Sequence, residues 1–203
     1  MKFLIIILLL IVPLLAEVGK VVYIKGEVSF LRDGKLKSAT VGMQLKEKDT
    51  FLTKESSLVK LLFADKSAIS IGSNSDFSIE NYFFDEKKNS MAKFKMKKGI
   101  FRAITGKIAK ISPDKFKLKT KTVTIGIRGR IFSGVIEKAR EEFFCEKGTI
   151  YISSRDTSFD IAKGFKIQVI PGRAPTPPQR YKSSELRKVH SQISGFTNKQ
   201  CKR

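Results

Sequence analysis

The chain has 203 residues, 41% hydrophobic and 29% charged, a balance typical of one globular domain with a short appendage. Forty Lys and Arg residues against 19 Asp and Glu give a formal net charge of +21. A chain of this length buries a core of its own, so neither a metal ion nor several disulfides is needed for folding.

The N-terminus is typical of an export signal. Lys2 precedes an unbroken apolar run from Phe3 to Val12, and Ala16 offers a small residue for cleavage. The run is shorter than the roughly 20 residues of a membrane-spanning helix. We therefore predict a cleaved signal peptide over residues 1–16, a periplasmic location and no stable membrane span afterwards. An uncleaved anchor is the alternative.

Residues 17–170 have the pattern of short strands separated by turns. Apolar and polar residues alternate, as in Phe116-Lys117-Leu118, and turn signals such as Asp33-Gly34 recur along the chain. Glycine precedes several apolar runs, at Gly26, Gly99 and Gly148. The pattern predicts an all-β domain of short antiparallel strands and hairpins, arranged as a β-sandwich or like a β-solenoid.

The chain changes character at residue 171. Four of the six prolines lie in "PGRAPTPPQR", residues 171–180, which predicts an extended connector. The next segment, "SSELRKVHSQISGF", predicts one short basic helix. We therefore divide the chain into the signal peptide, the β-domain over 17–170, and the connector with its helix over 171–203.

Two cysteines occur, Cys145 and Cys201. In an oxidising compartment an even number of cysteines favours one disulfide, which here would tie the C-terminal tail to the domain. The alternative is a pair of free thiols, because Cys145 lies in the apolar stretch "FFCE" and could be buried.

No pattern typical of an enzyme is present. The single histidine, His190, lies on the polar terminal helix, where a solvated surface position is expected. Two cysteines and one histidine are too few for a zinc site, and the glycine motifs of nucleotide sites and nucleophile elbows are missing. We predict a non-enzymatic protein with no metal and no cofactor. A polysaccharide-active enzyme with paired carboxylates is the least favoured alternative.

The stretch "TIGIRGRIFSG", residues 124–134, is the most distinctive motif. Its Gly126-Ile127-Arg128-Gly129 matches the glycine spacing of the clamp loop in one RNA-binding fold, but that loop joins two helices and both flanks here are strand-like. Glycines inside a strand pattern mark bulges or close backbone approaches. Arg128 is then either a buried hydrogen-bonded tie, which we favour, or part of an outward anion patch with Arg130.

The charge predicts anionic partners. An exported basic protein meets anionic glycans, lipid head groups or an envelope protein rather than nucleic acid, and ionic binding of this kind weakens with salt. The candidate binding residues are Lys119, Lys121, Gly126, Arg128, Gly129 and Arg130.

Two stretches resemble the FecR domain, a family named after a periplasmic regulator of iron-citrate uptake. The first is "KGIFRAITGKIAKISPDKFKLKTKTVTIGIRGRIFSG", residues 98–134, with its glycine-led strand and its "GIRG" turn. The second lies upstream and carries Gly42, Asp49, Thr53 and Asp65-Lys66-Ser67. Together they cover most of residues 18–137.

The resemblance implies an exported all-β module for sensing, scaffolding or envelope binding rather than catalysis. Lys121 stands where the family usually has proline, and Arg130 where it usually has threonine, so the resemblance leaves the ligand open. The family's regulator signals to a sigma factor through a membrane segment. Only two residues precede the leader here, so we expect no direct anti-sigma role. The functional alternative is an assembly factor for an envelope or secretion system.

Overall fold

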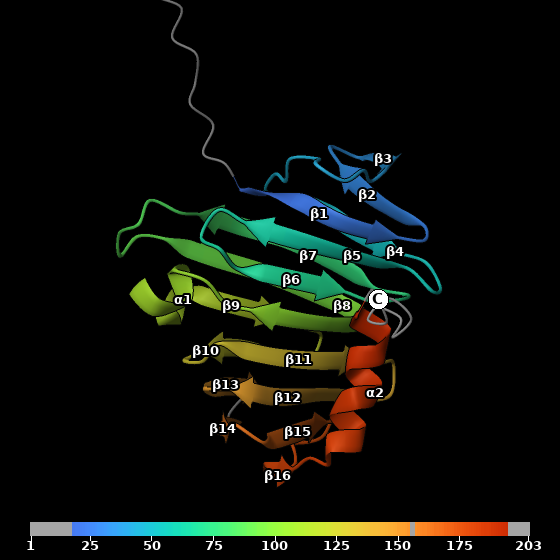
Figure 1. Ribbon diagram of the computed structural model, residues 1–203. Helices are drawn as coiled ribbons and strands as arrows, with labels where there is room; N and C mark the ends of the chain where they lie inside the picture. Colours follow the sequence, from blue (N-terminus) through green and yellow to red (C-terminus); the bar gives the residue numbers. More distant parts are fainter. Residues whose placement is uncertain (1–17, 155–156, 195–203) are drawn as a thin grey trace, which may run out of the picture.

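The computed structural model describes residues 18–154 and 157–194, and within them the strands form one continuous sheet that is not closed (Figure 1). The strands are β1 (Gly19–Lys25), β2 (Val28–Arg32), β3 (Lys35–Ser38), β4 (Thr50–Thr53), β5 (Leu58–Phe63), β6 (Ala68–Ile71), β7 (Asp76–Phe83), β8 (Met91–Ile104), β9 (Phe116–Lys119), β10 (Thr124–Ile127), β11 (Ile131–Ile136), β12 (Glu141–Lys147), β13 (Thr149–Ser154), β14 (Thr157–Ala162), β15 (Phe165–Val169) and β16 (Gln179–Arg180). The helices are α1 (Ile108–Ile111), the 3-10 turn η1 (Pro113–Lys115) and α2 (Ser183–Ile193). The predicted all-β class with a short C-terminal helix is confirmed.

The long strand β8 joins the two halves of the sheet. Its first part pairs with β7 and β9, and its second part pairs with β6 and β11. Sheet A therefore runs β1-β5-β6-β8-β11-β12-β15-β16, and sheet B runs β3-β2-β4-β7-β8-β9-β10-β13-β14. The pairing of β8 with β9 is parallel, and the other strand pairs are antiparallel.

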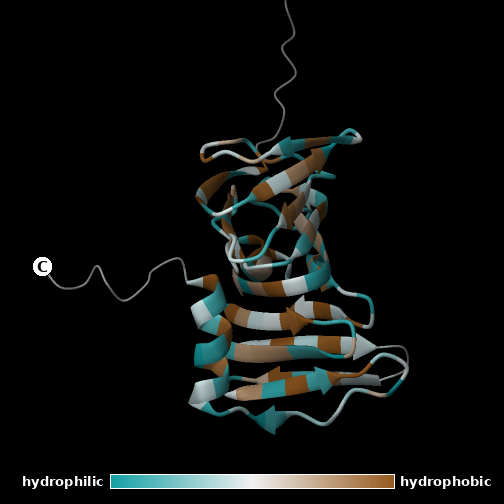
Figure 2. Ribbon diagram, turned by 90° about the vertical axis from the view of Figure 1, so that its right-hand side faces the viewer, coloured by the Kyte–Doolittle hydropathy of each residue, from teal (hydrophilic) through white to brown (hydrophobic). Residues whose placement is uncertain are grey.

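The core lies between sheet A and sheet B. The ring of Phe63 in sheet A packs at 5.0 Å from Phe94 and 5.3 Å from Tyr82, both in sheet B. Hydrophobic and hydrophilic residues alternate along most strands (Figure 2), so one face of these strands points to this core, whereas β3 and β16 are exposed along their length. Each buried Phe side chain contributes roughly 1.5–3 kcal/mol. The sequence predicts either a β-sandwich or an arrangement like a β-solenoid. The structure has a feature of each: two layers face each other as in a sandwich, and both belong to one continuous sheet.

Glycine stands at several points where the chain passes between the two sheets. Gly26 lies between β1 and β2, Gly99 lies at the point where β8 changes sheets, and Gly148 lies between β12 and β13. Their φ angles are +73°, +107° and +90°, a region that side chains with a Cβ rarely adopt. The glycines that precede apolar runs in the sequence are therefore crossover residues.

Helix α2 covers the outer face of sheet A. Val189 and Ile193 are buried against Leu58, Ile100 and Phe144, and Figure 1 places α2 across β8, β11 and β12. Strand β16, inside the proline-rich connector, pairs with β15 and leads the chain back to the sheet. The domain boundary at residue 171 remains a prediction.

Two predictions fall on residues outside the described ranges. The signal peptide over residues 1–16 is one, and the disulfide of Cys145 with Cys201 is the other, because Cys201 is not described. Within the described part of the chain, no helix has the length and apolar character needed to cross a membrane.

Candidate functional site

The predicted glycine-arginine motif forms the crossover from β10 to β11. Arg128 N donates to Thr149 O at 3.1 Å, and Arg130 N donates to Lys147 O at 2.8 Å. A Cβ on Gly129 would lie 2.8 Å from Thr149 N, and one on Gly148 would lie 2.3 Å from the Cα of Gly129. Gly129 is thus a glycine because two crossovers touch there, backbone against backbone.

Arg128 is exposed, so the favoured interpretation of a buried tie is wrong. Ile125 and Ile127 point into the core, and the two-residue period of a strand turns Thr124, Gly126 and Arg128 outward. No described residue forms a side-chain hydrogen bond or ion pair with Arg128, so its guanidinium is available to an anion.

The six candidate binding residues do not form a single site. Lys119 pairs with Thr124, which begins β10, whereas Arg128 follows the other end of that strand. Thr124 and Arg128 are about 13 Å apart along the chain direction. Lys121 lies in the turn beyond Lys119 and lines a different cavity. Arg130 lies on the other side of the crossover, on a groove shared with Lys107.

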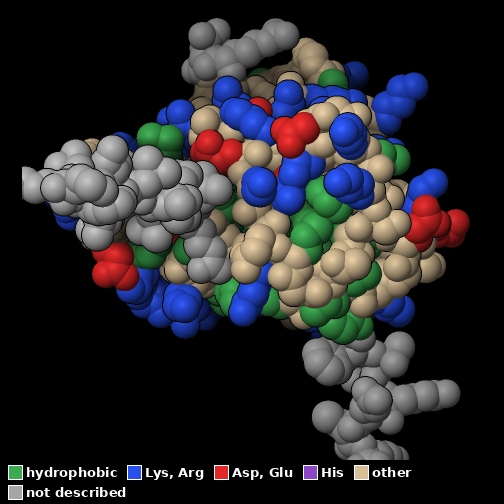
Figure 3. Space-filling view, turned by 90° about the horizontal axis from the view of Figure 1, so that it is seen from above, with side chains coloured by type: hydrophobic (Ala, Val, Ile, Leu, Met, Phe, Trp, Pro, Cys, Tyr) green, Lys and Arg blue, Asp and Glu red, His purple; other side chains and the backbone are tan. Residues whose placement is uncertain are grey.

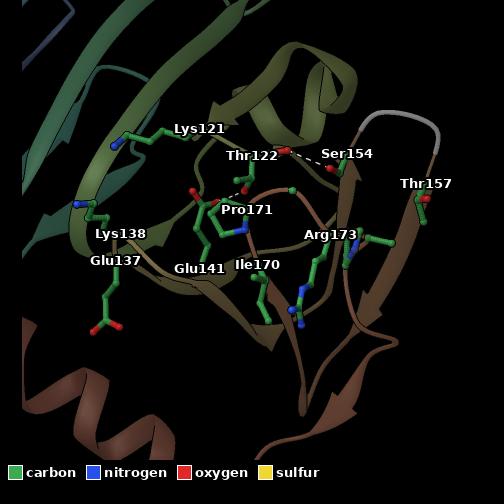
Figure 4. A pocket seen from close by; sticks show the side chains of 13 residues that line it. Lys121, Thr122, Glu137, Lys138, Glu141, Ser154, Thr157, Ile170, Pro171 and Arg173 are labelled. Carbon is green, nitrogen blue, oxygen red and sulfur yellow. Dashed lines mark hydrogen bonds between the residues drawn. The ribbon is translucent and has the colours of Figure 1, made fainter.

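The cavity beside Lys121 has a volume of about 620 Å³ and is drawn in Figure 4. The buried carboxylate of Glu141 accepts hydrogen bonds from the hydroxyls of Thr120 and Thr122, both at 2.5 Å. Glu137 points away from Glu141 (Figure 4) and pairs with Arg140 at 3.4 Å. The two carboxylates therefore do not converge as the acid and base of a glycosidase must.

The groove beside Arg130, about 420 Å³ in volume, is built over the loop of Asp65-Lys66-Ser67. Its basic side chains are Lys66, Lys107, Lys110, Arg130 and Lys147. The Lys107 ammonium is already paired with Glu86, and Asp65 is fully buried within its own hydrogen bonds. Asp65 and Ser67 therefore stabilise the loop between β5 and β6 and its contact with α1.

The outer face of sheet B carries a regular array of lysines. In the parallel pair β8 and β9, Lys93 stands opposite Lys117, and Lys95 stands opposite Lys119. All four side chains turn outward, since Phe94 and Leu118 between them are buried. We call this surface the lysine face; its members are Lys93, Lys95, Lys97, Lys117 and Lys119.

The register of the lysine face works against folding. Like charges directly opposite each other on neighbouring strands are destabilising, by the same 0.2–1 kcal/mol or so that opposite charges contribute. Lys97 pairs with Asp76 at 3.4 Å, but no described carboxylate forms an ion pair with the other four lysines. Fold stability does not account for this arrangement, so the lysine face is the best candidate for a binding surface.

A polar network, which the sequence analysis did not anticipate, ties α2 to sheet A. His190 Nε2 lies 3.0 Å from Glu146 Oε1, and Arg102 and Ser133 donate to the same carboxylate. Burial alone would raise the pKa of Glu146, but hydrogen bonds from Arg102, Ser133 and His190 outweigh it and hold that pKa below its usual value. The expectation that His190 is merely solvated is wrong.

Cys145 lies in the core of sheet A and is fully buried. Its thiol donates to Gly148 O at 3.3 Å, and burial raises its pKa to about 11. A thiol in this state is a poor nucleophile and a poor metal ligand.

The motif residues just described lie in a region that matches a known family. The FecR protein family matches residues 49–151, just over half of the chain. The chain belongs to the FecR protein family. The resemblance seen in the sequence is confirmed, and membership supports a sensing or regulatory module rather than an enzyme.

The fold of this FecR protein also occurs in solved structures. Two crystal structures of a candidate anti-sigma factor from Parabacteroides distasonis ATCC 8503 each match with a TM-score of 0.56 and 8% sequence identity, over 68% of this chain and 62% of that one. At this identity the likeness shows the fold alone, and the present chain spans less than two thirds of that protein's length. No curated protein matches.

The lysine face of this FecR protein had a partial signal in the sequence. Lysine occupies alternate positions in "KFKMKK" and again in "KFKLKTK". The alternation of lysine with apolar residues predicts that each strand has one solvent-exposed basic face, but it does not indicate which strands are neighbours in the sheet. The parallel pairing of β8 with β9, on which the array depends, follows from the α1 and η1 connection between them.

Proposed function

We propose that this FecR protein is exported to the periplasm and acts there as a non-catalytic binding module. In this proposal the lysine face binds an anionic polymer of the cell envelope, an acidic glycan. Binding is electrostatic, and the two strands hold the positive charges in place. The ligand is bound but not chemically changed.

The pairing of Lys93 with Lys117 and of Lys95 with Lys119 is the observation that carries this proposal. Four ammonium groups on two neighbouring strands repel one another in the free protein. A polyanion laid along the strands relieves that repulsion and releases its own counterions, so the arrangement favours the bound state.

Polar neighbours favour a glycan over a membrane surface. Ser78, Thr124 and Ser153 turn their hydroxyl groups to the same outer face of sheet B. A protein that lies on lipid inserts apolar side chains. The most exposed apolar side chains, Leu36 and Val41, lie in and after β3, at the end of the molecule seen in Figure 3, where many Lys and Arg side chains also gather.

The test is binding of labelled polygalacturonate to the mature protein and to a variant in which Lys93, Lys95, Lys117 and Lys119 are replaced by Glu. Glutamates at these positions keep like charges opposite each other, so stability changes little while the sign of the face reverses. We expect the variant to lose at least about tenfold in affinity and wild-type binding to weaken steeply with salt.

A second variant with the same net charge separates the face from total charge. It replaces the exposed lysines Lys25, Lys54, Lys163 and Lys188 by Glu, none of which lies on the lysine face. This variant should stay within roughly threefold of the wild type. Equal losses in the two variants, or a wild type that binds anionic vesicles but not polygalacturonate, would refute the proposal.

A further inference from the structure

Gly126 forms the floor of a hollow at the edge of the lysine face. It pairs with Lys117 on β9 and with Tyr151 on β13, and Arg128 follows two residues later, just beyond the end of β10. The hollow has a volume of about 180 Å³ and is lined also by Pro113 and Asp114 of η1. Tyr151 is 41% exposed here, whereas Tyr82, the other tyrosine of sheet B, is buried in the core.

The backbone does not require glycine at this position. Gly126 has no positive φ and its pairing with both neighbours is regular. A Cβ placed there would meet Tyr151 Cδ1 at 3.9 Å, an ordinary contact. Gly129, three residues later, has no such room. Glycine within a strand weakens it, and the remaining reason for one is the close approach of a ligand.

We propose that this hollow binds a single acidic sugar ring, as one subsite of the glycan surface proposed above, on which this inference rests. The space is smaller than the roughly 300–1,000 Å³ of clefts that hold drug-sized molecules, which fits one ring. Lys117 and Arg128 supply cations for the acid group, and Arg128 can bind it with two parallel hydrogen bonds.

The remaining lining residues distinguish a sugar from a bare anion. Tyr151 offers an aromatic surface to the C–H face of a ring. Asp114 accepts hydrogen bonds and therefore suits ring hydroxyl groups. It repels any anion, and the hydroxyl groups of a sugar offset that repulsion, whereas a free phosphate has no such groups. One acid group, several hydroxyls and an apolar face together describe a hexuronic acid residue.

The test fills the hollow without disturbing the fold. Gly126→Val adds a β-branched side chain at a strand position with room for it, so its melting temperature should equal or exceed that of the wild type. Ser29→Val on β2, an outward strand position of sheet B outside both the hollow and the lysine face, is the matched control. Each protein is titrated with trigalacturonate, with neutral maltotriose and with tripolyphosphate.

We expect the wild type to prefer trigalacturonate over both other probes. Gly126→Val should weaken trigalacturonate binding at least about tenfold, corresponding to about 1.4 kcal/mol, and leave tripolyphosphate binding unchanged, whereas Ser29→Val should bind each probe as the wild type does. Equal trigalacturonate affinity in Gly126→Val and wild type, or no preference over tripolyphosphate, would overturn the subsite. If the subsite fails this test but the variant with four glutamates on the lysine face still loses affinity for polygalacturonate, the proposed function of the lysine face is supported and only the subsite is refuted. If wild type binds neither trigalacturonate nor polygalacturonate, both proposals fail.

Discussion

Replacing Asp65 by Ala is expected to lower the free energy of unfolding by about 3–5 kcal/mol, because it removes the shared acceptor of a buried hydrogen-bond network. The Asp65 carboxylate is completely buried. It accepts hydrogen bonds from Ser67 N at 3.0 Å and Ser67 Oγ at 2.7 Å, from the Tyr82 hydroxyl at 3.0 Å and from Ile108 N at 3.1 Å. Alanine would leave all these donors buried without an acceptor.

The loss is measured as the shift in the urea midpoint of unfolding. Asp85→Ala is the comparison, because Asp85 also accepts hydrogen bonds within its own turn, from Lys87 N and Ser90 Oγ, but lies at the surface. Its loss should be much smaller. Similar midpoints for the two variants would mean that the Asp65 network does not hold the β5–β6 turn, the loop after β8 and α1 together.

The second large effect concerns the attachment of α2. Glu146→Gln removes the charge to which Arg102 and His190 bind, with a cost of about 2 kcal/mol in the docking of α2 on sheet A. Amide hydrogen exchange of α2, compared with that of β8, measures this directly at pH 7. The helix should lose protection in the variant while β8 keeps it.

Acid should reproduce the same change in the wild type. Folding lowers the pKa of Glu146 below its usual value of 4.5, so its contribution to stability is fully present above pH 4.5 and is lost as the pH falls through the folded-state pKa. The hydrogen bond from Lys166 also lowers the pKa of Glu185 on α2, so Glu185→Gln serves as the control for that second carboxylate. If protection of α2 is the same in Glu146→Gln and wild type at pH 7, the helix is held by its apolar contacts alone.

The sequence predicts the structure best where the residues of a single strand show the pattern by themselves. Alternation at Phe116-Lys117-Leu118 predicts an inward and an outward face, and β9 has them. Asp33-Gly34 forms the turn between β2 and β3, with both residues at positive φ. Gly26, Gly99 and Gly148 each precede an apolar run in the sequence, and the crossovers between the two sheets explain why glycine stands there.

The sequence does not predict contacts between residues that are far apart in the chain. Glu146 and His190 are 44 positions apart in the chain. Nothing in the sequence of the polar helix or of the strand "EEFFCEK" indicates that the two are in contact. The interpretation of Arg128 as a buried tie failed because strand parity, and not the arginine's hydrogen-bonding capacity, decides its direction. Lys119 is exposed, but the residues beside it on that face are lysines of β8, more than twenty positions earlier in the sequence.

The two sheets have unequal outer faces, and this bears on function. The outer face of sheet A is apolar around Ile100 and Phe144 and is covered by α2. The outer face of sheet B presents lysines and hydroxyl groups, and its array continues to Arg128. A FecR domain built in this way covers one outer face with its own C-terminal helix and leaves the charged face exposed.

The most direct test of the lysine face is to map where a bound glycan lies. In an isotope-labelled sample titrated with polygalacturonate, amide chemical shifts should change along the first half of β8, along β9 and along β10, and only slightly on α2 and on β1 to β3. Shift changes centred on β1 to β3, or on the groove beside Arg130, would contradict the account even if the affinity for the glycan were high.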